Sequence, residues 1–356
     1  YNPSYNRAPE MFGIANFVMS INENKSSKRR IDPMYRRVTS YEKYLREKSS
    51  SNLQLVTGLQ AIGFNFDANS SVPTVKNVAL YDRNHRCQIL IDVKKDLILS
   101  AGAINSPKLL QLSGIGHATH LQSLGVKVVK DLPGVGENLR DDLVVNLLFT
   151  TETIDLESPP ASFLSAVLFA ADNQTSTSLT NVEMLFSTGN MIGNGWPKEW
   201  QNALVLSPNV QQCLSRGTVR IASVDPLALP TIDPGYLTVE TDVDRVLNAI
   251  ALARKLLSQA SFAKWKFEEV APGRQLTSRS DLIRWIRQNV TTGFHYIGTC
   301  KMGTDALSVV NPANLKVWGV ERLRIVDASV APASFSANTQ SLTYALAARA
   351  VDLIAA

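Results

Sequence analysis

The chain has 356 residues, 45% of them hydrophobic and 19% charged, and a formal net charge of +5. This length permits one large or two medium domains with a well-buried core, and the composition is typical of globular proteins. No apolar run is long enough for a transmembrane helix, and the scattered basic residues lack interleaved aromatic side chains. We therefore expect neither a membrane nor a nucleic acid as a partner.

Cys87, Cys213 and Cys300 lie far apart, and no Cys/His cluster has the spacing of a zinc site. We therefore expect no metal. Four N-x-S/T sequons occur, at Asn24, Asn69, Asn173 and Asn289. Chance alone gives about that number, so the sequons permit secretion without indicating it. The sequence therefore does not predict the cellular compartment.

The first part of the chain is polar and irregular, and regular structure is expected to begin near its end. Residues 1–50 are broken by charged and small residues, although residues 41–48 have helical propensity. Residues 52–66 predict a strand, a glycine turn and a second strand. Residues 77–81 and 88–93 predict a β-hairpin across a polar turn.

A strand that leads into a helix follows. Residues 96–100 read as a short buried strand, and the small residues 101–103 allow close approach of another backbone or a flat ligand. Asn105 or Ser106 can cap a helix that has Pro107 at its first position. Such a connection suits the binding of a phosphate or a dinucleotide, but it also occurs as an ordinary strand–helix link in α/β domains.

The remaining chain predicts an antiparallel region followed by a return to α/β character. Residues 131–139 form a Pro/Gly loop after a strand at 126–129. Strands of an antiparallel sheet are expected at 144–150, 182–187, 204–206 and 217–223. Amphipathic helices are expected at 242–258 and 281–289, and a strand and a final helix at 322–327 and 340–356.

Several of these stretches together resemble the glucose–methanol–choline (GMC) family of FAD-dependent oxidoreductases. Residues 102–116, GAINSPKLLQLSGIG, resemble the second signature of that family. The loop at 131–139, DLPGVGENL, resembles its PGVGENLxDH motif, although Asp142 stands where the motif has its final His. Three segments resemble its closing motifs: GFHYIGTCKMG (293–303), VERLRIVDASVAP (320–332) and NTQSLTYALAARAVDLI (338–354).

The resemblance implies a two-domain α/β flavoprotein. Its discontinuous FAD-binding domain would comprise residues 51–140 and 296–356. Its substrate-binding domain, an antiparallel sheet with helices, would comprise residues 1–50 and 141–295. The chain contains no GxGxxG that follows a strand and opens a helix. We therefore expect an N-terminal fragment of the same enzyme as a second chain, and weak FAD binding without it.

The resemblance also implies contacts with FAD. The position of Ala61 lies against the adenine through its backbone, and Ala101 belongs to the small-residue turn near the cofactor. Asp327 and Ala328 match the position that meets the pyrophosphate–ribityl portion, although Asp327 could simply cap a loop. The helix N-terminus at Thr339 would direct its positive dipole at the pyrimidine end of the flavin.

Two residues match the catalytic pair of the family, His295 and Asn338. A neutral imidazole at His295 suits the base that takes the proton of an alcohol, while Asn338 can hydrogen-bond the substrate oxygen. A buried, hydrogen-bonded histidine and a helix N-cap are the alternative structural roles of the two. The other histidines are expected at the surface: His85, His117 and His120.

The implied function is therefore FAD-dependent oxidation of a small-molecule alcohol. An alternative is a lyase on the same scaffold, such as a hydroxynitrile lyase, in which FAD does not carry out the redox step. A lyase could use the same histidine, so retention of His295 and Asn338 favours oxidation without excluding the alternative.

Overall fold

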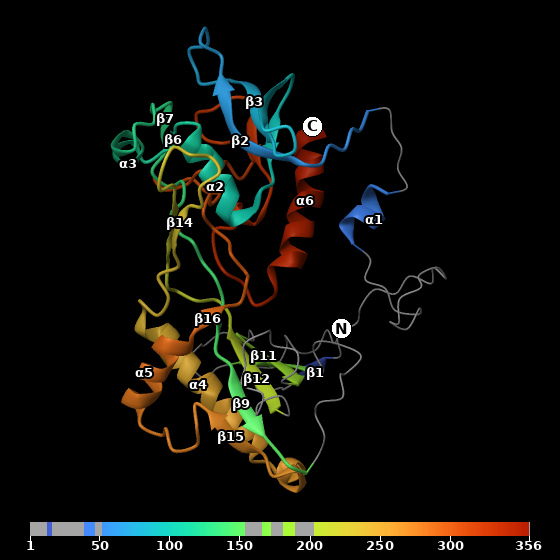
Figure 1. Cartoon of the computed structure of the whole chain (residues 1–356), viewed down its shortest axis with the longest axis vertical. Helices are drawn as coiled ribbons and strands as arrows, with labels where there is room; N and C mark the ends of the chain where they lie inside the picture. Colours follow the sequence, from blue (N-terminus) through green and yellow to red (C-terminus); the bar gives the residue numbers. More distant parts are fainter. Residues whose placement is uncertain are drawn as a thin grey trace.

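The computed structural model of the chain describes residues 13–15, 39–46, 52–153, 166–171, 181–188 and 203–355. In Figure 1 these residues form an upper and a lower half, and the chain crosses between the halves more than once. The short helix α1 (Ser40–Tyr44) lies to one side. Most of the predicted substrate-domain segment 1–50 falls outside the described residues.

The upper half is built on a parallel strand pair. β5 (Leu97–Leu99) pairs in parallel with β17 (Leu323–Ile325), although the two are more than 200 residues apart in sequence. Beside this pair lies an antiparallel three-stranded sheet, β2 (Leu59–Phe66), β3 (Val75–Asp82) and β4 (Cys87–Asp92). The other elements here are α2 (Gly102–Leu112), β6 (Ile115–Gly116), α3 (Ala118–Ser123), β7 (Lys130–Asp131), β13 (Thr218–Arg220), β14 (Thr231–Asp233), η4 (Ala328–Val330) and α6 (Thr339–Ala355).

The lower half is an eight-stranded antiparallel sheet. Its main order is β1 (Gly13–Ala15), β10 (Ala166–Ala170), β11 (Val182–Thr188), β12 (Ala203–Val210), β8 (Leu143–Val144) and β16 (Thr291–Thr292). β9 (Leu147–Thr150) joins it by pairing with β12 and with β15 (Glu268–Ala271). The helices are α4 (Glu240–Leu257), η3 (Ala260–Trp265) and α5 (Arg279–Asn289).

Each half has its own hydrophobic core. The upper core joins α2, β5 and β17 through Leu110, Leu99 and Ile325. The lower core places the apolar face of α4, including Val246 and Ile250, against the antiparallel sheet. The α/β class with an antiparallel second part is therefore confirmed, because one core is built on parallel strands and the other on antiparallel strands.

Helix α2 begins earlier than the sequence predicts. It starts at Gly102, so Pro107 lies inside the helix rather than at its first position. A long-range contact replaces the expected local cap, because Gly102 N–H donates to Asp327 Oδ2 at 2.9 Å. Pro107 has no N–H for the carbonyl of Ala103, and the hydroxyl of Thr299 donates to that oxygen instead, at 2.6 Å.

The Pro/Gly loop at 131–139 is a tight packing element. A Cβ added to Gly134 would lie 2.1 Å from the carbonyl oxygen of Leu307. Gly136 has a φ of 83°, and a Cβ there would lie 2.1 Å from the carbonyl oxygen of Val219. The two glycines are therefore required where the loop is wedged between neighbouring backbones.

Two strands that the sequence predicts are absent from the described part of the chain. Residues 53–57 form no strand, and neither do residues 126–129, where the strand β7 begins instead at Lys130. The last helix forms as predicted, but Ala350 is its one buried residue among those described, and Ile354 is exposed. The predicted hairpin is confirmed as β3 and β4.

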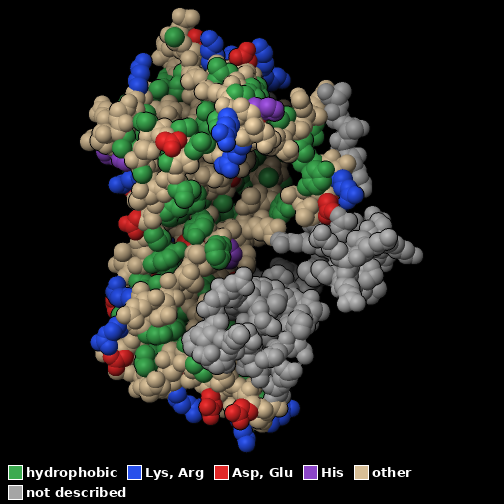
Figure 2. Space-filling model, in the orientation of Figure 1, with side chains coloured by type: hydrophobic (Ala, Val, Ile, Leu, Met, Phe, Trp, Pro, Cys, Tyr) green, Lys and Arg blue, Asp and Glu red, His purple; other side chains and the backbone are tan. Residues whose placement is uncertain are grey.

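No helix among the described residues is both long and apolar enough to span a membrane. Figure 2 shows one face of the molecule, on which charged side chains gather mainly toward the two ends. The same face is hollowed between the upper and lower halves.

Candidate active site

His295 is positioned by a tight turn at the end of β16. Phe294 adopts a left-handed conformation with a φ of 60°, and its N–H donates to Thr292 Oγ1 at 2.7 Å. The N–H of His295 then donates to Asp141 Oδ1 at 2.9 Å, and that of Gly293 donates to the carbonyl of Asp142 at 2.9 Å. The backbone before the imidazole is thus fixed against the segment that enters β8.

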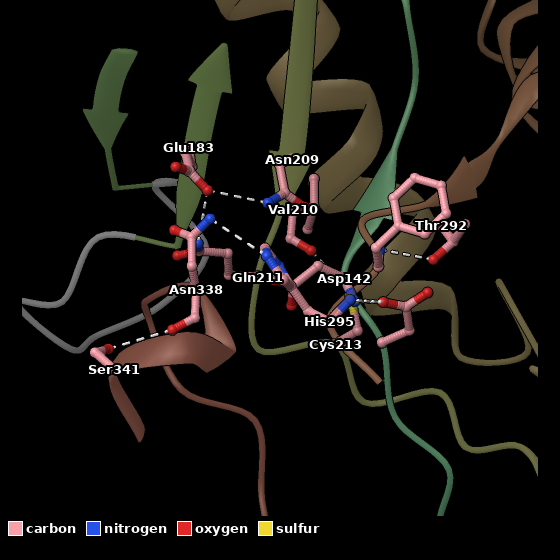
Figure 3. A network of polar contacts seen from close by, with 12 residues as sticks. Asp142, Glu183, Asn209, Val210, Gln211, Cys213, Thr292, His295, Asn338 and Ser341 are labelled. Carbon is pink, nitrogen blue, oxygen red and sulfur yellow. Dashed lines mark hydrogen bonds and ion pairs between the residues drawn. The ribbon is translucent and has the colours of Figure 1, made fainter. Parts of the chain in front are cut away.

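Both ring nitrogens of His295 have partners, as Figure 3 shows. Nδ1 lies 2.8 Å from Asp142 Oδ2, and Nε2 lies 3.3 Å from Asn338 Nδ2. Asn338 immediately precedes α6, whose N-terminal end faces the lower half in Figure 1. The structure therefore brings the two predicted catalytic residues together, one from each half of the molecule.

Burial and charge act in opposite directions on this histidine. Burial alone lowers the pKa of His295, but the hydrogen bond and charge of Asp142, together with the charges of Glu183 and Asp141, outweigh it, and the pKa lies above its ordinary value. Burial raises the pKa of Asp142 to about 6, although His295 opposes that rise.

A second buried carboxylate lies close to the pair. Glu183 on β11 is 1% exposed, and its Oε2 accepts hydrogen bonds from Asn209 Nδ2 at 3.1 Å and Gln211 Nε2 at 3.2 Å. Burial raises the pKa of Glu183, and its charge also acts on His295. Tyr236 donates its hydroxyl proton to Asp141, and burial raises the pKa of that phenol.

The predicted cofactor residues gather in the upper half, around the start of α2. Asp327 is buried and accepts at Oδ2 from Gly102 N–H at 2.9 Å and from the hydroxyl of Ser106 at 2.5 Å. Its Oδ1 accepts from Ser329 N–H at 2.8 Å. Asp327 does cap η4, as the alternative interpretation held, and it also ties β17 to the N-terminus of α2.

Ala61 and Ala101 line the same pocket, which has a volume of about 370 Å³. Other lining residues are Gln60, Arg83, Asn105, Lys108, Leu109, Leu227 and Leu229. Ala328 follows Asp327 at the start of η4, and Thr339 opens α6 beside Asn338. The predicted residues thus form two groups, one at this pocket and one at the N-terminus of α6.

These residues fit the FAD that the resemblance implies. A Cβ added to Gly102 would meet no atom within 4 Å, so the backbone at the start of α2 is open to a ligand. The small side chain of Ala101 beside it is exposed. The first N–H of α2 is already bound to Asp327 Oδ2, so the opening at Gly102 offers room for a ligand beside the backbone rather than a free donor.

Sequence reasoning missed the buried acids of the site. Asp142 stands out in the sequence only as a departure from the family motif, in the run Arg140-Asp141-Asp142. The sequence signal that points to Asp142 is the presence of an acidic residue where the motif has a basic histidine. Glu183 and Asn209 carry no sequence signal, because they read as ordinary polar positions on antiparallel strands.

The other histidines play no part in this site. The side chain of His85 is 77% exposed and pairs with Asp82, 2.7 Å away. His117 is exposed, and His120 is half-buried with its Nε2 3.2 Å from the carbonyl of Ile221. The surface prediction therefore holds for His85 and His117 and only in part for His120. No group of potential metal ligands was found among the residues that the structure describes.

Comparison with known proteins gives two family matches. The family model "GMC oxidoreductase" for the N-terminal part matches residues 23–144, and the one for the C-terminal part matches residues 214–347. Choline oxidase of Arthrobacter globiformis is 34% identical over 314 residues, which covers 85% of this chain and 56% of the oxidase. Human mitochondrial choline dehydrogenase is 32% identical, with 84% and 52% covered. The chain spans about half the length of these curated relatives.

Solved structures show the same fold. Pyridoxine 4-oxidase from Mesorbium loti has a TM-score of 0.79 and 26% identity, covering 89% of this chain and 61% of that one. Formate oxidase, at 23% identity and a TM-score of 0.74, covers 83% of this chain and 59% of that one. The second likeness bears on the fold alone.

Proposed function

The chain belongs to the GMC oxidoreductase family, whose members use FAD, and from this premise we propose that it oxidises an alcohol. The observation that carries the proposal is the contact of His295 Nε2 with Asn338 at the junction of the two halves. In this proposal, residues 51–140 and 296–356 hold FAD, joined at the pocket by Leu227 and Leu229, and residues 1–50 and the lower-half part of 141–295 face the substrate.

FAD, when bound, supplies the acceptor for the hydride that leaves the alcohol carbon. Ala61 and Ala101 would hold its adenosine end, because they line one pocket. Asp327 and Ala328 would meet its central portion beside the N-terminus of α2. Thr339, at the N-terminus of α6, would place a helix dipole near the flavin ring and favour negative charge there.

His295 would act as the general base. With its proton on Nδ1, shared with Asp142 at 2.8 Å, the imidazole has an electron pair on Nε2, to which a substrate hydroxyl can bind in place of the Asn338 amide. Nε2 then takes the proton of the substrate hydroxyl: the O–H bond breaks and an N–H bond forms. Neutral imidazole is required, so activity should rise as pH increases through the raised pKa of His295.

Asn338 would bind the substrate oxygen. Its amide nitrogen lies 3.3 Å from Nε2, so a hydroxyl oxygen near Nε2 is within reach of the same N–H group. An amide cannot act as the base, but its N–H can stabilise the negative charge that develops on the oxygen as the proton leaves.

The experiment is a spectroscopic screen of the flavin-loaded protein without oxygen. A panel of alcohols that includes choline, pyridoxine and an aryl alcohol is added, and the loss of the oxidised flavin absorbance is followed. Bleaching by at least one alcohol supports oxidation. Release of aldehyde from a cyanohydrin with no bleaching by any alcohol would instead favour the lyase alternative.

The second chain remains a proposal of its own. Leu53, Leu55 and Val56 are exposed in an extended segment of the upper half. Ile98 on β5 and Val351 on α6 are exposed apolar side chains as well. A second chain with an α/β segment packed on these side chains would bury them. Native mass spectrometry of the purified material tests whether such a chain is bound.

A further inference from the structure

The carboxylate of Asp142 touches the imidazole of the proposed base, on the side away from Asn338. Asp142 is 4% exposed, and its Oδ2 lies 2.8 Å from His295 Nδ1. We propose that Asp142 is a positioning residue, which keeps the His295 proton on Nδ1 and thereby presents the Nε2 electron pair to the substrate. This inference rests on the proposed function, because it acts through the same base.

The geometry favours one neutral tautomer. With the proton on Nδ1, the ring donates to the carboxylate, and Nε2 accepts from Asn338 Nδ2 at 3.3 Å. With the proton on Nε2, the electron pair of Nδ1 would face a carboxylate oxygen and the new N–H would face the amide N–H. The contact at Nδ1 would then be repulsive, whereas rotation of the Asn338 amide would present its oxygen to the new Nε2–H, so it is the Asp142 carboxylate that disfavours the alternative tautomer.

Asp142 and His295 are held in one backbone frame. The carbonyl of Asp142 accepts from Gly293 N–H at 2.9 Å. Asp141 Oδ1 accepts from the N–H groups of both Asp142 and His295, each at 2.9 Å. Tyr236 binds the other oxygen of Asp141. The carboxylate therefore has little freedom to leave the imidazole, and the ring plane is fixed before a substrate binds.

Among the charged groups of the described residues, Asp142 is the one whose side chain hydrogen-bonds the His295 ring. In the described part of the chain, the titratable groups that act on this pair include Asp141, Glu183 and Cys213, and Tyr236 binds Asp141. Glu183 acts on His295 through its charge, and its own hydrogen bonds go to Asn209 and Gln211. Glu183 is therefore a matched control, a buried carboxylate near the imidazole without the tautomer-fixing contact.

The arrangement also stabilises the protonated base. When Nε2 takes the hydroxyl proton, the ring becomes an imidazolium with an N–H on each nitrogen, and its Nδ1–H still points at Asp142. The positive charge then forms next to a carboxylate that is already in place. No oxidant beyond FAD is required, because the step on this side of the reaction is a proton transfer.

The first test uses NMR and needs no turnover. The chain has four histidines, so selective ¹⁵N labelling of the rings gives a spectrum simple enough to assign. We expect His295 to carry its neutral-state proton on Nδ1. Asp142→Asn should lower its pKa by at least about one pH unit, because a carboxylate partner within hydrogen-bond distance is lost. Glu183→Gln should lower that pKa by less and leave the tautomer unchanged.

The second test is the pH profile of flavin reduction by the best alcohol of the screen. Asp142→Asn should move the acid limb to lower pH and lower the high-pH plateau by about tenfold or more, a part of what a positioned base contributes. A merely structural role would lower the plateau and leave the limb in place.

Two results would overturn the proposal: a His295 proton on Nε2 in the unaltered protein, or an Asp142→Asn variant in which neither the tautomer nor the pKa of His295 changes. If the NMR results hold but no alcohol reduces the flavin, the positioning contact stands and the proposed oxidation fails. The two ideas are therefore separable.

Discussion

Asp142 should make the protein less stable as pH rises toward neutrality. Its carboxyl group is buried, and the folded protein raises its pKa from 3.8 to about 6. Between these values the folded chain keeps a proton that the unfolded chain has released. The free energy of unfolding therefore falls as pH rises through this window. Above about pH 6 the ionisation of Asp142 changes it little further.

The size of the effect follows from the two pKa values. The difference between about 6 and 3.8 corresponds to roughly 3 kcal/mol in the free energy of unfolding. About half of that should be regained on going from pH 7.5 to pH 5. The raised pKa of His295 acts in the same direction at higher pH, because the folded protein also keeps that proton longer.

The assay is urea unfolding at pH 7.5 and pH 5, for the unaltered chain and for Asp142→Asn. The variant has no carboxyl group to titrate, so its free energy of unfolding should depend less on pH. Asp82→Asn is the control, because Asp82 and His85 form a similar pair at the exposed surface, 2.7 Å apart. Its removal should change the difference between the two pH values much less, because the raised pKa of His85 belongs to a solvent-exposed pair that contributes little to stability.

One result would refute this reasoning. If Asp142→Asn loses as much stability between pH 5 and pH 7.5 as the unaltered chain, the Asp142 carboxyl is not the group that titrates in the folded state. An equal change in the slope for Asp82→Asn would show that contact with a histidine matters and that burial does not.

Three further substitutions test separate contacts. Asn338→Ala should slow flavin reduction by about 10²-fold, because one donor to the developing alkoxide is lost, with little change in stability. Thr299→Val should destabilise the fold by about 1–3 kcal/mol, because the carbonyl of Ala103 loses its donor in a buried position. Gly136→Ala should destabilise it more, since its φ is 83° and the new Cβ would lie 2.1 Å from the carbonyl oxygen of Val219.

Stopped-flow absorbance checks the first of these, and urea unfolding checks the other two. An Asn338→Ala variant that reduces its flavin at the unaltered rate would remove this residue from the mechanism. A Thr299→Val variant as stable as its Thr299→Ser control would show that the Ala103 carbonyl finds another donor. A Gly136→Ala variant of unchanged stability would mean that the loop can move away from β13.

Local sequence patterns predicted those parts of the fold that depend on local interactions. The hairpin of β3 and β4 was predictable because alternating apolar residues flank a short polar turn. The start of α2 was not, because its cap is Asp327, 225 residues away, and a local rule places the cap at Asn105 or Ser106. Long-range contacts decide such boundaries, and a single sequence does not display them.

The residues of the site likewise differ in how far the sequence alone predicts them. His295 and Asn338 could be named only through the resemblance, because 43 residues separate them and no periodicity relates them. Asp142 lies 153 residues before His295. The sequence shows that an acidic residue stands where the family motif has His, but it does not show that this residue contacts His295. Glu183 was unpredictable, because an acidic residue on a strand normally faces solvent, and burial here depends on Asn209 and Gln211.

The most direct test of the central claim is anaerobic reduction of the bound flavin by an alcohol, compared between the unaltered protein and His295→Gln. The account predicts that alcohol bleaches the flavin of the unaltered protein, and that His295→Gln slows this step by about 10²- to 10⁴-fold while still binding FAD. Equal rates in the two proteins would contradict the assignment of His295 as the base.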